Sequence, residues 1–139
     1  MSKIYEITGI AKSGRSGTVT TNDKSLTLQL GSPNTGANLY NPEQLFACGY
    51  ASCFSQAMFA VTKNNNLDIK EAPIEVTVQL HSDEVKGFNL YVGIDAKLDG
   101  IDIEKAKDIM KQTHNMCPYS KLVKPENFLF IRINGVDIK

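Results

Sequence analysis

Two cysteines are the residues of this sequence best suited to chemistry, because a thiolate is both a nucleophile and a redox centre. Cys53 lies in the apolar stretch 41–63, where a cysteine is often only a small hydrophobic side chain. Cys117 lies in NMCPYS, and Pro118 disfavours helical geometry at Cys117 while suiting the first position of a new helix. The unpaired N–H groups of such a helix would favour a thiolate. Cys117 therefore fits a reactive thiol as well as a structural one.

Charged residues that could assist a thiol lie elsewhere in the chain. Arg15 is flanked by glycines in a predicted turn, where it is either simply solvated or able to lower a thiol pKa and bind a peroxide or carboxylate. Glu43 falls in the first turn of a predicted helix, a position that the helix dipole alone favours for an acid. His114 and Cys117 lack a second pair of ligands, so the zinc interpretation is weak, and we predict neither a metal nor a cofactor.

The segment that positions Cys53 is predicted to be a helix. Asn41 is a suitable N-cap, Pro42 suits the first helical position, and Gln44 stands where a capping-box partner would. The helix should run to about Lys63 and end at the asparagines 64–66. Its apolar residues cover most of the circumference, which predicts burial on nearly all sides.

The rest of the chain shows strand and helix patterns in separate runs. Period-two alternation of apolar residues predicts strands, and helical spacing predicts a second helix. The predicted strands are 3–12, 18–21, 25–30, 74–82, 88–98 and 128–133, with a loop at 31–38 and the second helix at 102–115. Because no βαβ rhythm repeats, we predict an α+β fold with a mostly antiparallel sheet.

Composition limits the class of protein. A chain of 139 residues with 42% apolar content suits a single domain, residues 1–139. Fifteen basic and fifteen acidic residues balance without clustering, which disfavours a nucleic-acid binder. The start MSKIYEITG lacks the pattern of a signal peptide, and polar residues interrupt the longest apolar stretch. We therefore expect a cytoplasmic protein with no membrane partner, in which sparse cysteines favour thiol chemistry over a disulfide scaffold.

Three motifs together resemble the organic hydroperoxide resistance (Ohr) branch of the Ohr/OsmC family of thiol peroxidases. They are NPEQLFACGYASCF, THNMCPYS and the loop GRSG at 14–17, and they span nearly the whole chain in order. The resemblance implies an OsmC-like fold and an intertwined homodimer, in which sheets wrap a long buried central helix and two active sites lie at the subunit interface. It also implies that Cys53 is the peroxidatic thiol, that Cys117 is the resolving thiol, and that Arg15 and Glu43 form a polar network beside Cys53.

Two positions depart from the family pattern. Cys48 stands where alanine is more common, and Ser16 stands where an acidic residue is frequent. Cys48 lies five residues before Cys53, well round towards the opposite face of a regular helix. We therefore predict that Cys48 belongs to the core and does not pair directly with Cys53.

The implied function is antioxidant: reduction of alkyl or fatty-acid hydroperoxides to alcohols during oxidative stress. A Cys53 thiolate would attack one peroxide oxygen and become a sulfenic acid, which Cys117 would condense into a redox-active disulfide. The resemblance implies that a dithiol, such as a lipoylated protein, reduces this disulfide. Apolar neighbours such as Phe54 and Met58 would favour organic over hydrogen peroxide, by about 0.8 kcal/mol for each buried methylene.

The polar network poses a geometric problem. Arg15 would stabilise the thiolate and the leaving oxyanion while Glu43 orients it. Ten residues of unbroken helix, however, separate Glu43 from Cys53 by roughly 15 Å, too far for one guanidinium to contact both. Three solutions are open: the helix breaks near Gly49, Glu43 occupies a short separate turn, or Arg15 contacts one of the two only in one state.

Two other functions also fit the sequence. One is an OsmC-type peroxidase with broader oxidant specificity, which relative rates with alkyl hydroperoxides and hydrogen peroxide would distinguish. The other is a non-catalytic module that holds a hydrophobic ligand on its apolar helices and uses the cysteines structurally. Slow alkylation of Cys53 and Cys117 would favour that second alternative.

Overall fold

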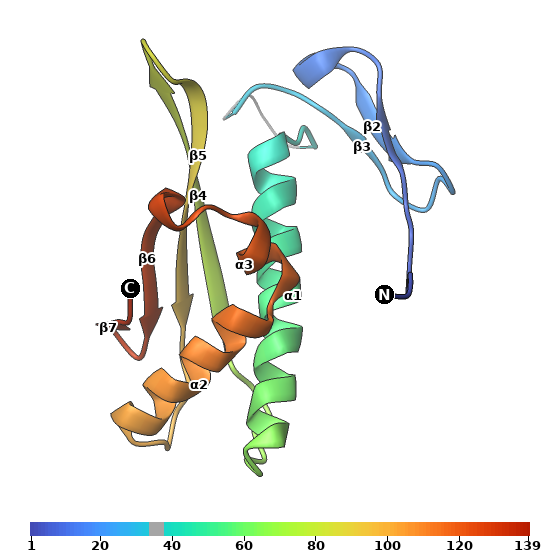
Figure 1. The fold of residues 1–139 in the computed structure, drawn as a ribbon. Coiled ribbons are helices and arrows are strands. Elements are labelled where there is room, and N and C mark those ends of the chain that lie inside the picture. Colours follow the sequence, from blue (N-terminus) through green and yellow to red (C-terminus); the bar gives the residue numbers. More distant parts are fainter. Residues whose placement is uncertain (34–37) are drawn as a thin grey trace. The chain divides into compact units, whose positions relative to one another are not determined.

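The computed structural model describes residues 1–33 and 38–139 of the α+β chain. It divides the chain into two compact units, Met1–Leu45 and Phe46–Lys139. The elements, shown in Figure 1, are β1 (Gly9–Ala11), a 3-10 turn (Gly14–Ser16), β2 (Thr18–Thr21), β3 (Thr27–Gln29), α1 (Pro42–Asn64), β4 (Ile74–Asp83), β5 (Gly87–Ala96), α2 (Ile103–Met116), α3 (Pro118–Leu122), a second 3-10 turn (Pro125–Asn127), β6 (Phe128–Ile133) and β7 (Val136–Asp137).

The first unit contains a small antiparallel sheet in the order β1-β2-β3. Its first and third strands are shorter than the predicted 3–12 and 25–30, because only residues 9–11 and 27–29 pair with β2. In the described part of this unit Leu30 is the one buried residue, and apolar side chains are exposed at Ile4, Tyr5, Ile7 and Ile10. The sheet thus has almost no core of its own. Of the predicted loop 31–38, residues 34–37 lie outside the described residues.

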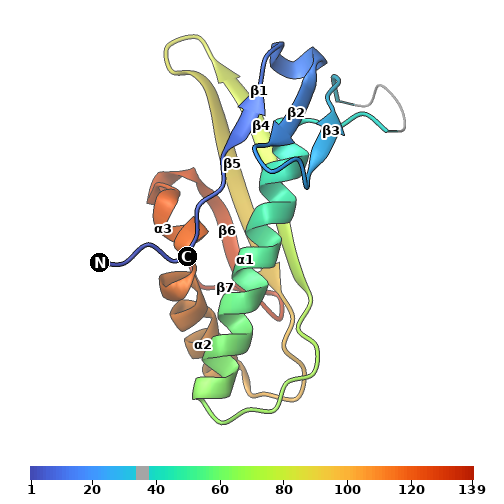
Figure 2. The same cartoon turned by 90° about the vertical axis from the view of Figure 1, so that its right-hand side faces the viewer.

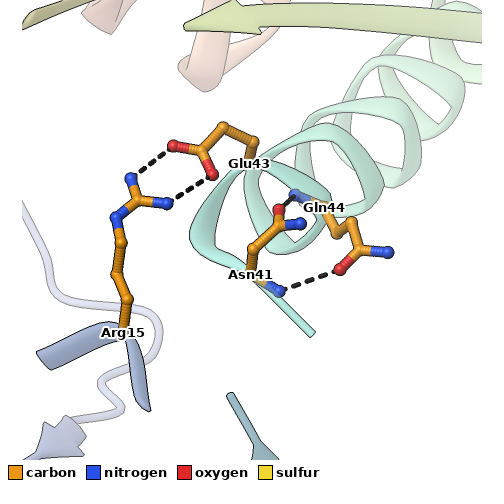
Figure 3. A network of polar contacts seen from close by, with 4 residues as sticks. All are labelled: Arg15, Asn41, Glu43 and Gln44. Carbon is orange, nitrogen blue, oxygen red and sulfur yellow. Dashed lines mark hydrogen bonds and ion pairs between the residues drawn. The ribbon is translucent and has the colours of Figure 1, made fainter. Parts of the chain in front are cut away.

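The long helix α1 begins and ends as its sequence predicts. The Asn41 side chain accepts a hydrogen bond from the Gln44 backbone N–H at 2.9 Å, and the Asn41 N–H donates to the Gln44 side chain at 2.8 Å (Figure 3). This is the reciprocal capping box, which satisfies two otherwise unpaired N–H groups. At the other end, Asn66 adopts the left-handed conformation with φ of 59°, a geometry that asparagine tolerates.

The second unit is built on a four-stranded sheet in the order β4-β5-β6-β7. The predicted hairpin is confirmed: β4 and β5 are antiparallel in register from Ile74↔Ala96 to Asp83↔Gly87. β5 and β6 are parallel, since the chain crosses between them through α2 and α3. The sheet is therefore mostly antiparallel, with one parallel pair.

The core of the second unit lies where α2 and the greater part of α1 cover one face of this sheet (Figures 1 and 2). Its fully buried members include Phe54, Met58, Ile94, Ile109 and Ile133. By length and composition α1 could also cross a membrane, a test that the core helix of a soluble protein passes as well.

Burial of α1 differs from the prediction. Its buried residues, Tyr50, Phe54, Ala57, Met58, Val61 and Thr62, fall on one face, so this chain does not enclose the helix on nearly all sides. Cys48 is exposed, and the prediction that it belongs to the core is wrong for this chain. Ser52 and Gln56, four and eight residues further along the same face, are exposed too.

Candidate active site

Two of the three free cysteines meet in the second unit. The Cys117 thiol donates to the Cys53 sulfur at 3.6 Å, although 64 residues separate them in the chain. Cys53 is partly exposed and Cys117 is fully buried. Because a disulfide bond measures about 2 Å, the two sulfurs need to approach by roughly 1.5 Å to bond.

Cys117 occupies the junction between α2 and α3. It ends α2 and begins α3 with φ of −65° and ψ of 120°, and Pro118 takes the first position of α3. The predicted effect of Pro118 on the residue before it is confirmed, because these angles are extended rather than helical. The extended residue lets the chain turn from α2 into α3, while the middle of α1 supplies Cys53.

The environment of Cys53 pulls its pKa in two directions. Burial raises the pKa of the Cys53 thiol above its ordinary value, a hydrogen bond from the Tyr119 backbone N–H opposes that rise, and the neighbouring Cys117 thiol adds to it. That the amides of α3 favour a thiolate at Cys117 stays a prediction. One of these amides, the Tyr119 N–H, acts on the Cys53 sulfur, because α3 brings its first turn against α1.

Arg15 and Glu43 form a two-pronged ion pair in the first unit (Figure 3). The guanidinium Nη1 and Nη2 donate to the two carboxylate oxygens at 2.8 and 2.5 Å, a geometry that fixes the orientation of both groups. The Glu43 side chain is 15% exposed and that of Arg15 is 48% exposed. The hydrogen bonds from Arg15 hold the pKa of the Glu43 carboxyl below its usual range, so Glu43 stays ionised.

The helix α1 is continuous, which excludes two of the three solutions to the distance between Glu43 and Cys53. The helix runs from Pro42 through Gly49 to Asn64, with Glu43 in its first turn. A break near Gly49 and a separate turn for Glu43 are therefore both wrong. A state-dependent contact of Arg15 stays a prediction. Ser16 stands where an acidic residue is frequent in the family, and its hydroxyl donates to the Ser13 carbonyl. The acid that binds Arg15 in this structure is Glu43.

The zinc interpretation gains no further ligand. Among the described residues there is no group of three His, Cys, Asp or Glu side chains that could hold a metal ion. The His114 ring packs edge-on against Phe128, and burial lowers its pKa.

Comparisons with known proteins show the family of this chain. The family described as OsmC-like protein matches residues 35–129. An organic hydroperoxide resistance protein-like chain of Mycoplasma pneumoniae is 41% identical over 142 residues, covering 99% of this chain and all of that protein. The chain belongs to the organic hydroperoxide resistance (Ohr) branch of the OsmC-like family. Ohr protein OhrB of Bacillus subtilis is 39% identical over 118 residues, covering 82% of this chain and 86% of that protein.

Solved Ohr structures share the fold. An organic hydroperoxide resistance protein of Vibrio cholerae, crystallised with captopril in one of its active sites, superposes with a TM-score of 0.90 at 37% identity, covering 99% of this chain and 97% of that one. Bacillus subtilis OhrB gives a TM-score of 0.81 at 35% identity, with 94% and 96% covered. The OsmC-like α+β fold expected from the three sequence motifs is therefore confirmed.

Contacts between α3 and α1, which the sequence did not reveal, hold the Ohr thiol pair together. The buried hydroxyls of Tyr50 and Ser120 share a hydrogen bond of 2.6 Å. The Tyr119 ring packs against Phe46 and Tyr50, with its hydroxyl over Gly49. A β-carbon at Gly49 would lie 2.9 Å from that hydroxyl oxygen, so glycine permits the close approach. Periodicity reports which face of a helix is apolar, but not which distant residue packs against it.

We expect Gly49→Ala to change stability according to the residue at position 119. Alanine is favoured over glycine within a helix by about 1 kcal/mol, but its methyl group would displace the Tyr119 hydroxyl. In a Tyr119→Phe background the nearest remaining ring atoms are 3.5 Å away, an ordinary contact. Thermal unfolding should therefore find Gly49→Ala more stabilising in that background than in the wild type. Equal effects in both backgrounds would show that the close approach does not limit residue 49.

Proposed function

We propose that this chain is a cysteine-based peroxidase that reduces organic hydroperoxides to alcohols. The observation that carries the proposal is the 3.6 Å approach of two free thiols, Cys53 and Cys117, in a member of the Ohr branch. A partly exposed thiol can receive a peroxide, and a buried thiol beside it can capture the oxidised sulfur. The names of the relatives, organic hydroperoxide resistance proteins, support the substrate class.

The reaction balances in three steps. The Cys53 thiolate attacks the terminal oxygen of ROOH, the O–O bond breaks, and RO⁻ takes a proton to leave as the alcohol. Cys53 is then a sulfenic acid. The Cys117 sulfur attacks it, water departs, and a disulfide forms. A dithiol returns two electrons and two protons, and we propose a lipoylated protein because its dithiol closes readily to a cyclic disulfide.

Arg15 is the proposed electrostatic partner of Cys53. Burial raises the pKa of Cys53, so a nearby cation is needed to favour the thiolate at neutral pH. The guanidinium of Arg15 is held by both Glu43 carboxylate oxygens, which leaves its remaining N–H groups to bind a peroxide oxygen. We place this network at the subunit interface of a homodimer and assign it the stabilisation of the thiolate and the departing oxyanion.

A homodimer is expected in solution. The first unit buries only Leu30 among its described residues, and a three-stranded sheet without a core is not stable alone. Exposed Ile4, Tyr5, Ile7 and Ile10 supply apolar surface that a second subunit would cover. Sedimentation at micromolar concentration should give twice the 15.3 kDa chain mass. A stable, monodisperse monomer would contradict the interface site.

We propose further that the protein is soluble and cytoplasmic, with no nucleic-acid or membrane partner. Its 15 basic and 15 acidic residues balance. The chain therefore carries no net positive charge to attract it to phosphate backbones.

Peroxide consumption by the purified protein tests the function. With dihydrolipoamide as reductant, an alkyl hydroperoxide should be consumed faster than hydrogen peroxide, and thioredoxin should support less turnover. Equal rates with both peroxides would favour an OsmC-type enzyme of broader specificity. Absence of turnover with any peroxide and either reductant, together with slow thiol alkylation, would favour the binding module.

Cys117→Ser should separate oxidation from turnover. Cys53 can still attack one peroxide, but no intramolecular disulfide can form, so the sulfenic acid persists or is oxidised further. Mass spectrometry should find one or two added oxygens on Cys53 and lost dithiol-dependent turnover. An unmodified Cys53 after excess peroxide would contradict the assigned roles.

A further inference from the structure

A cavity separate from the two thiols lies in the second unit. It has a volume of about 540 Å³ and is bounded by the end of α2, by α3 with the segment after it, and by β6 and the last two residues of the chain. This volume falls within the range of small-molecule pockets, roughly 300–1,000 Å³. Neither Cys53 nor Cys117 lines it. The cavity is therefore not the peroxide site proposed above.

The floor of the cavity is apolar. Phe128 and Ile131 are buried core residues of β6, and Val123 and Ile138 are partly buried beside them. A ligand with an alkyl or similar apolar body would lose water-exposed surface on this floor.

The rim of the cavity is cationic. Lys111, Lys121 and Lys139 line it, and no acidic side chain does so among its described lining residues. In the described part of the chain Lys111 and Lys121 form no ion pair, whereas the Lys139 ammonium donates to the Phe128 carbonyl. Three ammonium groups around a partly apolar cavity raise the local concentration of anions, so the rim favours an anionic ligand.

His114 lines one wall of the cavity, and its ring is largely shielded from water. Nδ1 of His114 is buried and has no hydrogen-bond partner among the described residues. Burial lowers the pKa of His114, so the ring is neutral at physiological pH and one tautomer carries a hydrogen on Nδ1. A neutral imidazole adds no charge to the cavity, so the lysine ammonium groups are the cations that line it.

We propose that this cavity binds a monocarboxylate with a short alkyl chain. The carboxylate would pair with Lys111 and Lys121, while the alkyl chain would lie on Phe128, Ile131 and Ile138. His114 and Ser120 stand three residues before and after Cys117, so the occupant would contact both helices that meet at that thiol.

Titration of the full chain in its native assembly tests the site, and it needs no peroxidase activity. Octanoate should bind saturably by calorimetry and shift the NMR signals of the α2–α3 junction. Acetate has the charge without the chain, and 1-octanol has the chain without the charge. Both should bind at least about tenfold more weakly than octanoate, because acetate lacks the burial of the alkyl chain and 1-octanol lacks the ion pairs with lysine. Equal binding of octanoate and 1-octanol would overturn the anion site.

Paired lysine variants locate the bound carboxylate. Lys111→Gln with Lys121→Gln should weaken octanoate binding by about tenfold without lowering the melting temperature. Lys107→Gln is the matched control, because Lys107 lies one turn before Lys111 on α2 and does not line the cavity. It should leave the affinity unchanged. If the double variant keeps its affinity and the NMR shifts centre on Cys53, octanoate binds at the peroxide site and the cavity proposal is wrong. If octanoate shows no saturable binding to the wild type, the cavity binds no such ligand.

Discussion

Replacing Cys53 by serine should abolish the reduction of organic hydroperoxides. A serine hydroxyl is far less acidic than a thiol and cannot form a sulfenic acid, so neither the attack nor the disulfide step remains. Removing a catalytic nucleophile typically lowers the rate by about 1,000-fold or more, which would leave only the background reaction with the dithiol. Steady-state consumption of an alkyl hydroperoxide with dihydrolipoamide measures this loss.

Cys48→Ser is the matched control for that loss. Cys48 lies on the same helix but is exposed, and its hydroxyl replacement removes a thiol of similar size without disturbing the Cys53–Cys117 pair. It should retain wild-type turnover and still form one disulfide under peroxide. If Cys48→Ser loses as much activity as Cys53→Ser, the redox pair proposed here is incomplete, and wild-type turnover in Cys53→Ser would remove Cys53 from the mechanism.

Local chemistry explains why much of this fold could be predicted from the sequence. The capping box of Asn41 and Gln44, the left-handed Asn66 and the helix start at Pro118 all depend on residues within a few positions of one another. The alternation of apolar and polar residues predicted the β4–β5 hairpin, which is also a local feature. Two strands that follow each other and are joined by a short turn usually pair with each other.

Contacts between distant segments account for what the sequence did not predict. The Tyr119 amide acts on Cys53, and the Ser120 hydroxyl bonds Tyr50, only because α3 folds back onto α1. Cys48 is exposed although burial was predicted, because contacts made by distant segments decide burial as well. Apolar composition indicates that a helix surface is buried in an assembly, but not whether the same chain buries it. The roles of Cys53, Cys117, Arg15 and Glu43 stay predictions for the variants described here.

Arg15→Ala should lower the rate much more than it lowers stability. Arg15 lies on a 3-10 turn with its side chain half exposed, and its hydrogen bonds go to Glu43 rather than into a packed core. Its proposed role is electrostatic, and removing one donor to a developing oxyanion typically costs on the order of 100-fold in rate. Thermal unfolding should give a melting temperature close to that of the wild type, while peroxidase assays show most of the activity lost.

The pH dependence of Cys53 alkylation tests whether the Arg15 effect is electrostatic. A cation near the thiol favours the thiolate and lowers its pKa, so Arg15→Ala should raise the pH needed for alkylation above the wild-type value. Arg15→Lys should restore only part of the rate, because an ammonium keeps the charge but not the two-pronged bond to Glu43. Glu43→Gln, which leaves the capping box of α1 intact, should lower the rate by freeing Arg15. An Arg15→Ala protein that melts much earlier, yet keeps full activity per folded molecule, would make Arg15 a structural residue.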